Sequence, residues 1–178
     1  MIPHGLYDLK YNKAYVNIGV SKDTSEFACD SIRVWWENYG KFQYPNCTSI
    51  LMLADGGGSN SSRHYIFKED LQNLVDKIGV EIRMAHFPPY TSKWNPIEHR
   101  LFPHITRSLN GVILKSHDYV KELIENTTTR TGLKVKAHII KKIYQTGRKY
   151  ADNFKKNMRI LFDDYLGQWN YRAIPEKI

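Results

Sequence analysis

Residues 49–60 read Ser-Ile-Leu-Met-Leu-Ala-Asp-Gly-Gly-Gly-Ser-Asn. The apolar run 49–54 has the length and residue types of a buried strand, so Asp55 is expected where that strand leaves its sheet. The glycines that follow predict a turn with little side-chain bulk beside the carboxylate. The stretch therefore predicts a sheet that presents an acid at the end of one strand.

A second acid, Glu98, lies where a helix is expected to begin. Asn95 is a good N-cap and Pro96 a good first helical residue, which puts Glu98 in the first turn, at the third helical position. A carboxylate at a strand end and another on a first helical turn can converge on two divalent cations. Such a pair can activate an oxygen nucleophile and neutralise charge on a phosphodiester. We therefore predict that Asp55 and Glu98 are catalytic, metal-binding residues.

Each part of this prediction has an alternative. Asp55 before glycines could be only a turn former, and Glu98 could cap its own helix through the N-x-x-E spacing. Gly56 and Gly57 would let a phosphate backbone approach, with Asn60 supporting the site, but the triplet matches neither the P-loop nor the dinucleotide fingerprint. Three histidines could approach the site, although a lone histidine is more often structural: His86, His99 and His104.

Periodicity and capping signals outline the remaining elements. We expect two strands within 5–20, strands at 80–87 and 133–140, and helices at 24–40, 62–78, 116–126 and 151–161. A capping box at 23–26 opens the first helix, and Gly40 and Gly79 end the first two. Pro103 should kink or stop the helix that carries Glu98. Strands followed by alternating strands and helices predict an α/β fold, a mixed sheet flanked by helices.

Size and composition bound the function. A chain of 178 residues with 42% hydrophobic residues suits a single domain, residues 1–178, and argues against disorder. No apolar stretch approaches the ~20 residues that span a bilayer, and no signal-peptide pattern is present, so no membrane partner is expected. Cys29 and Cys47 have no CxxC spacing, which excludes cysteine-ligated zinc and suggests a reducing cytoplasm.

The net charge of +8 is uneven along the chain. Residues 1–90 hold 9 Lys and Arg against 10 Asp and Glu, whereas residues 91–178 hold 17 against 8. A basic half of this kind favours a polyanion such as nucleic acid, the alternative being a solvated basic surface.

Several segments together resemble a DDE-type insertion-sequence transposase, the Rhodopirellula transposase DDE domain family. The central ones are 54–60 (Ala-Asp-Gly-Gly-Gly-Ser-Asn), 86–89 (His-Phe-Pro-Pro) and 91–102 (Thr-Ser-Lys-Trp-Asn-Pro-Ile-Glu-His-Arg-Leu-Phe). The likeness continues at 5–8, 24–28, 127–134 and 169–171, so it covers nearly the whole chain in order.

The resemblance implies a ribonuclease H-like fold, two Mg²⁺ or Mn²⁺ ions and an Asp-Asp-Glu triad. Asp55 matches its second aspartate and Glu98 its glutamate. The resemblance also implies that the DNA of transposon ends and targets is the partner and that the full-length form is a homo-oligomer. It further implies that the protein is cytoplasmic and nucleoid-associated, and that it is encoded by a prokaryotic mobile element. The candidate DNA-binding residues are Lys93, Trp94, Arg100, Arg130 and Lys134.

One departure from the family pattern limits the expected activity. The family's first aspartate lies on the first strand of the fold, upstream of the segment that matches 5–8, so we expect a truncated catalytic domain that lacks this strand. Asp8 falls in a different matched segment, so we do not assign it the role of the first catalytic aspartate. Residues 127–178 are expected to be a basic C-terminal extension of the domain. We therefore expect a fragment of an enzyme that cleaves and transfers DNA strands, and we expect this chain to be inactive when it is alone. The rivals are a non-enzymatic DNA-binding remnant that modulates a full-length transposase, and a structure-selective nuclease.

Overall fold

The computed structural model describes residues 1–88 and 90–176, which form two compact units. Unit 1 comprises Met1–Lys22 and Lys93–Tyr144, and unit 2 comprises Asp23–Ser92 and Gln145–Ile178. Each unit has a mixed sheet with helices, which confirms the predicted α/β class. The single domain 1–178, with 127–178 as its extension, stays a prediction.

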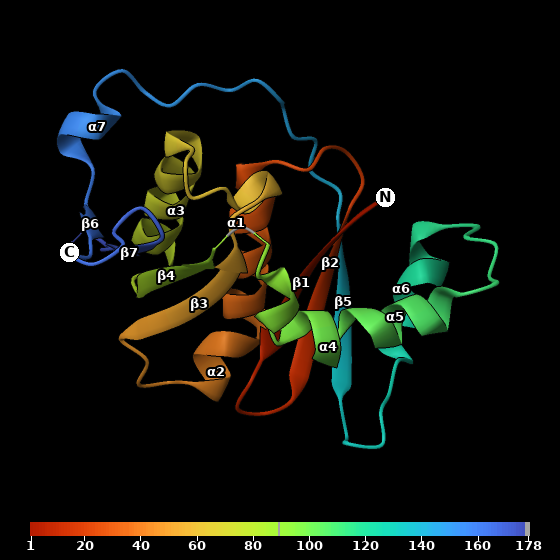
Figure 1. The fold of residues 1–178 in the computed structure, drawn as a ribbon. Helices are drawn as coiled ribbons and strands as arrows, with labels where there is room; N and C mark the ends of the chain where they lie inside the picture. The colour runs from red at the N-terminus through yellow and green to blue at the C-terminus, as the bar shows by residue number, and fades with distance from the viewer. Residues whose placement is uncertain (89, 177–178) are drawn as a thin grey trace. The chain divides into compact units, whose positions relative to one another are not determined.

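Unit 1 is built on a three-stranded sheet in the order β1-β2-β5 (Figure 1). Strands β1 (Ile2–Asp8) and β2 (Lys13–Gly19) are antiparallel, and β5 (Lys134–Ile140) runs parallel to β2. The strands expected within 5–20 and at 133–140 are thus confirmed.

Three helices of unit 1, α4 (Ile97–Arg100), α5 (Phe102–Leu109) and α6 (His117–Glu125), pack with this sheet around one hydrophobic core. The apolar stripes of α5 and α6 supply Ile105, Val120 and Ile124 to that core, beside Val16 of β2. Ser116 caps α6 by accepting a hydrogen bond from the Tyr119 N–H at 3.1 Å, so the helix predicted at 116–126 is confirmed.

Unit 2 has a four-stranded sheet in the order β3-β4-β7-β6. Strands β3 (Ser49–Asp55) and β4 (Glu81–Phe87) are parallel, and β7 (Asn170–Ala173) pairs antiparallel with both β4 and β6 (Ile160–Phe162). The helix predicted at 151–161 is wrong. Only α7 (Phe154–Asn157) is helical, because residues 160–162 pair with β7 instead.

The prediction that 49–54 is a buried strand is also wrong. Among the described residues, β3 pairs on one side alone, with β4, and is therefore an edge strand. Leu51 and Leu53 are 61% and 39% exposed. The apolar residues that suggested burial instead give this edge an unusually apolar surface.

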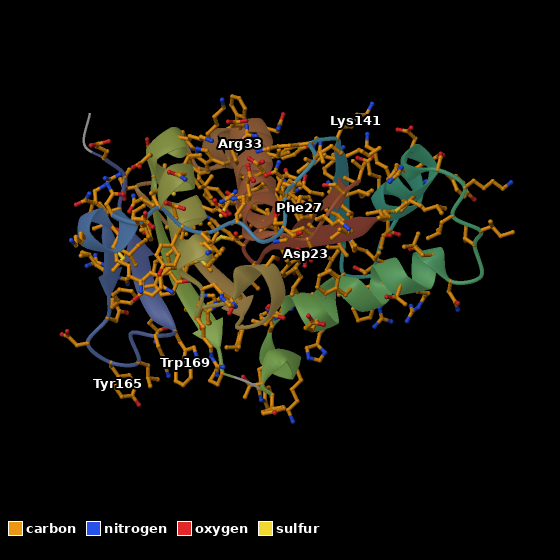
Figure 2. All side chains as sticks on the ribbon, turned by 90° about the horizontal axis from the view of Figure 1, so that it is seen from above. Asp23, Phe27, Arg33, Lys141, Tyr165 and Trp169 are labelled. Carbon is orange, nitrogen blue, oxygen red and sulfur yellow. The ribbon has the colours of Figure 1, made fainter. Side chains whose placement is uncertain are left out.

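Two helical segments accompany this sheet. Helix α3 (Tyr65–Ile78) packs on β4 and β7, and Gly79 ends it at φ 67°, as predicted, although the helix begins three residues later than expected. Helix α1 (Ser25–Trp35) packs against α3 and follows Asp23, and Phe27 lies on its first turn (Figure 2).

The start and end of α1 differ from the prediction. Its cap is Thr24, one residue after the Asp23 that opens the predicted capping box, and the Thr24 side chain accepts a hydrogen bond from the Phe27 N–H. Glu26 forms an ion pair with Arg148. The helix also does not stop at Gly40. It runs into a π-helical turn, η1 (Trp36–Gly40), and a short helix, α2 (Lys41–Gln43). A Cβ at Gly40 would lie 2.6 Å from the Trp36 ring, so packing against that ring is what requires glycine here.

Across the described residues, none of the helices is both long and apolar enough to cross a membrane.

Candidate functional site

Asp55 is the last residue of β3, opposite Phe87 in the parallel register with β4. Its side chain is exposed and takes no hydrogen bond or ion pair from the part of the chain that the structure describes. A rigid strand thus delivers an unpaired carboxylate to solvent at the point where the strand ends. This is the placement that the sequence predicted for it, although the strand itself is an edge strand.

The glycines after Asp55 are not equivalent. Gly58 has φ 58°, a left-handed conformation that favours glycine, and it begins a 3₁₀ turn, η2 (Gly58–Asn60). A Cβ at Gly57 would meet no atom within 4 Å, and one at Gly56 would lie 3.6 Å from the Phe87 carbonyl oxygen. The fold therefore needs glycine at Gly58, whereas a Cβ would meet open space at Gly57 and only an ordinary van der Waals contact at Gly56.

His86 holds the backbone of Asp55 from β4. Its Nδ1 lies 3.2 Å from the Asp55 carbonyl oxygen, and its Nε2 lies 2.9 Å from the Tyr171 hydroxyl. Burial lowers the pKa of His86 and raises the pKa of Tyr171, so the ring is neutral and the hydroxyl keeps its proton. Tyr171 therefore donates to Nε2, and Nδ1–H donates to Asp55.

His86 is also fixed through its main chain. Its N–H donates to the Trp169 carbonyl oxygen at 2.9 Å, and its ring meets that of Phe67 edge to face. Trp169 and Tyr165 lie on the connection between β6 and β7 (Figure 2). We predicted that His86 could approach the site, but not that it contacts Tyr171, because the pairing of β4 with β7 leaves no local signal in the sequence.

Glu98 belongs to unit 1 and lies on α4. The helix begins one residue later than predicted, so Pro96 is at the N-cap position and Glu98 is the second helical residue. The prediction that Asn95 is the N-cap is therefore wrong. Asn95 lies one position earlier, is buried, and its Oδ1 accepts a long hydrogen bond of 3.5 Å from the Ile97 N–H. The half-buried Glu98 carboxylate has no hydrogen-bond or ion-pair partner within 1–88 and 90–176, so the structure shows no self-capping contact.

The interruption expected from Pro103 is present. Helix α4 ends at Arg100, Leu101 has φ −126°, and α5 restarts with Pro103 in its first turn. Proline has no N–H to donate to a carbonyl one turn earlier, and its ring crowds that carbonyl. Glu98 is consequently presented from a helix of four residues.

The segment before α4 carries an exposed aromatic and a basic residue. Trp94 is 69% exposed, and the Lys93 ammonium lies 5.3 Å from its ring centroid. His99 Nε2 hydrogen-bonds the Lys93 carbonyl oxygen, so this histidine ties the segment to α4. An exposed indole beside a cation is suited to stacking on a nucleic-acid base or lying along a backbone.

Charge differs sharply between the two units. Unit 1 holds 13 Lys and Arg against 5 Asp and Glu, and unit 2 holds 13 against 13. The whole net charge of +8 therefore lies in unit 1, rather than in the 91–178 half as a whole. All five predicted DNA-binding residues, Lys93, Trp94, Arg100, Arg130 and Lys134, lie in unit 1 and are exposed.

No group of three or more His, Cys, Asp or Glu side chains placed to hold a metal occurs among the described residues. Asp55 and Glu98 still fit the chemistry of a magnesium ligand. Each is a hard oxygen donor whose carboxylate is not engaged by another described residue.

A sequence model of the family described as Rhodopirellula transposase DDE domain matches residues 1–175. No curated protein and no solved structure matches the chain.

Proposed function

The chain belongs to the Rhodopirellula transposase DDE domain family, and from this we propose that it carries part of a metal-dependent site for DNA strand cleavage and transfer. The single observation that carries the proposal is the match over residues 1–175, which includes both candidate carboxylates. The free Asp55 carboxylate at the end of β3 supports it.

In the proposed site, Asp55 and Glu98 bind Mg²⁺ or Mn²⁺, and Gly56 and Gly57 leave room for a phosphate backbone. The bound ions supply charge neutralisation on the phosphate and a lower pKa for the attacking oxygen. Asp55 contributes a carboxylate held by a strand, and Glu98 contributes one held by the start of α4. A ribonuclease H-like arrangement is part of the proposal, supported by the parallel β3–β4 pair and the antiparallel β1–β2 pair.

We also propose that the chain alone does not cut DNA, because among the described residues only Asp55 and Glu98 match acids of the family's Asp-Asp-Glu triad. Asp8 is not the third. Its Oδ1 accepts the N–H groups of Lys10 and Tyr11 at 3.0 and 3.2 Å, so this carboxylate is used in the turn between β1 and β2. An acid committed to its own turn is a poor metal ligand.

A second function, DNA binding without catalysis, is favoured by one observation. Unit 1 carries a net charge of +8 and an exposed Trp94, which suffice for salt-sensitive binding even without a metal site. Such a protein could modulate a complete transposase by occupying its DNA.

Metal titration separates the two functions. Mn²⁺ binding should be measurable by water proton relaxation in the wild-type chain and should be lost in Asp55→Asn and weakened in Glu98→Gln. The matched controls are Asp152→Asn and Glu122→Gln, which remove exposed acids of the same units. Equal Mn²⁺ binding by all five proteins would overturn the metal-binding roles of Asp55 and Glu98 and leave only the DNA-binding function.

Supercoiled plasmid with Mg²⁺ or Mn²⁺ tests the predicted inactivity. We expect no nicking by the wild-type chain. Nicking that disappears in Glu98→Gln but persists in Glu122→Gln would show that two carboxylates suffice and that the inactivity proposal is wrong.

A further inference from the structure

The loop that follows Asp55 is tied at both ends by buried polar side chains of unit 2. At its start, His86 donates to the Asp55 carbonyl oxygen. At its end, the Lys68 ammonium donates to the Ser62 carbonyl oxygen at 2.5 Å. Both donors are buried, with Lys68 3% and His86 5% exposed.

Both donors, His86 and Lys68, contact the same residue of β7, Tyr171. The Tyr171 hydroxyl donates to His86, and the Tyr171 ring centroid lies 4.8 Å from the Lys68 ammonium. Tyr171 itself is 0% exposed. The rings of Tyr65 and Phe162 lie 5.4 and 5.8 Å from the same ammonium.

Lys68 is an expensive group to bury. Within the described residues it has no carboxylate partner, so aromatic faces and one carbonyl are what offset its lost hydration. A site filled only for packing would take a methionine or leucine at lower cost. The cost is understandable if the ammonium fixes the Ser62 carbonyl, as His86 fixes that of Asp55.

We propose that Tyr171, His86 and Lys68 form a clamp that holds both ends of loop 55–62 and so positions Asp55. The clamp makes the geometry of that carboxylate depend on a strand more than 100 residues further along the chain, since β7 starts at Asn170. The role given to Asp55 rests on the proposed function, whereas the clamping of the loop does not. Tyr171, His86 and Lys68 are positioning residues.

The test uses three variants of the full chain. Tyr171→Phe removes the hydroxyl that orients His86 and keeps the ring over Lys68. Lys68→Met removes the donor to Ser62 and keeps a side chain of similar length. Tyr65→Phe is the matched control, because its ring also lies over Lys68 while its hydroxyl has no hydrogen-bond partner among the described residues.

Two readouts report on the clamp without any activity. The ¹⁵N shifts of the His86 ring should show a protonated Nδ1 in the wild type and the control, and tautomer averaging in Tyr171→Phe. Hydrogen exchange should rise about tenfold in Lys68→Met at the Ser61 and His64 amides, the change expected when one hydrogen bond is removed. These amides donate to the carbonyls of Gly58 and Ser61. Urea unfolding of every variant corrects the exchange rates for changes in global stability.

Mn²⁺ affinity is the third readout and separates the clamp from the metal site. We expect Tyr171→Phe to weaken Mn²⁺ binding about threefold to tenfold and Asp55→Asn to abolish it. Unchanged tautomer and exchange in the variants would overturn the clamp, even if Asp55→Asn still abolished binding. Altered tautomer and exchange, with Mn²⁺ binding indifferent to Asp55→Asn, would support the clamp and overturn the metal role of Asp55.

Discussion

Arg148 and Asp70 form an ion pair of unit 2 in which Nη2 lies 2.6 Å from Oδ1. The Asp70 side chain is 6% exposed and also accepts the Ser25 hydroxyl, while Arg148 extends its second nitrogen to Glu26. This pair therefore links the segment after residue 145 to the first turn of α1 and to α3.

Replacing Arg148 with methionine should destabilise the protein by about 2 kcal/mol, because it leaves the nearly buried Asp70 carboxylate without its cation. The part of Arg148 that remains in water keeps the loss below that of a fully buried pair. Urea unfolding measures the change. Lys149→Met, at an exposed neighbour without a side-chain partner among the described residues, should be neutral, and equal effects of the two variants would contradict this account.

Lys68 should make stability depend on alkaline pH. Burial lowers the pKa of Lys68 from 10.5 to about 8, so between these values the unfolded chain holds a proton that the folded chain has released. Stability then rises with pH across this window, by up to about 3 kcal/mol, an amount that the aromatic rings reduce by favouring the cation.

Urea unfolding at pH 7, 8, 9 and 10 tests this dependence. The free energy of unfolding of the wild type should increase relative to that of Lys68→Met as the pH rises above 8. Parallel pH curves for the two proteins would show that Lys68 keeps its proton when folded.

DNA affinity should reside in unit 1. The double variant Arg130→Ala/Lys134→Ala should weaken binding to any sequence and reduce the log–log salt slope by about 0.9 for each DNA phosphate that it no longer neutralises. Fluorescence anisotropy from 50 to 200 mM salt measures both quantities. Lys149→Ala/Lys156→Ala removes the same charge from the neutral unit 2 and should have little effect. A larger drop in affinity in that control would place the DNA on unit 2.

The glycines after Asp55 should differ in their tolerance of alanine. Gly58→Ala should cost about 1–2 kcal/mol, because a Cβ is strained at φ 58°. Gly57→Ala should leave stability within about 0.5 kcal/mol, since its Cβ would meet nothing. If DNA approaches here, Gly57→Ala should nevertheless weaken DNA binding in the presence of Mn²⁺. Equal thermal stability of the two variants would contradict the assignment of φ strain to Gly58.

Local sequence signals were enough to predict a helix end wherever a capping or terminating residue in the sequence sets that end. Ser116 caps the start of α6 and Gly79 ends α3, and both of these helix ends were predicted from the sequence. The segment at 151–161 failed because pairing with β7 overrides helix propensity there, and pairing partners far along the chain leave no periodic trace.

The candidate site divides in the same way. The position of Asp55 at a strand end followed from an apolar run and three glycines, and the interruption near Glu98 followed from Pro103. The hydrogen bonds of His86 and the burial of Lys68 could not be predicted, because they depend on Tyr171 of a strand that pairs across about 85 intervening positions.

The place of β7 between β4 and β6 has a consequence for synthesis of the protein. Once the ribosome has synthesised residue 100, the residues of β3, α3 and β4 are all present in the nascent chain. The β6–β7 pair of the same sheet cannot form until residue 173 has been synthesised. During that interval the apolar residues of β4 have no strand on their second side, a state that invites chaperone binding or misassembly. A nonsense mutation shortly before residue 170 should therefore yield an insoluble or degraded product rather than a smaller working one.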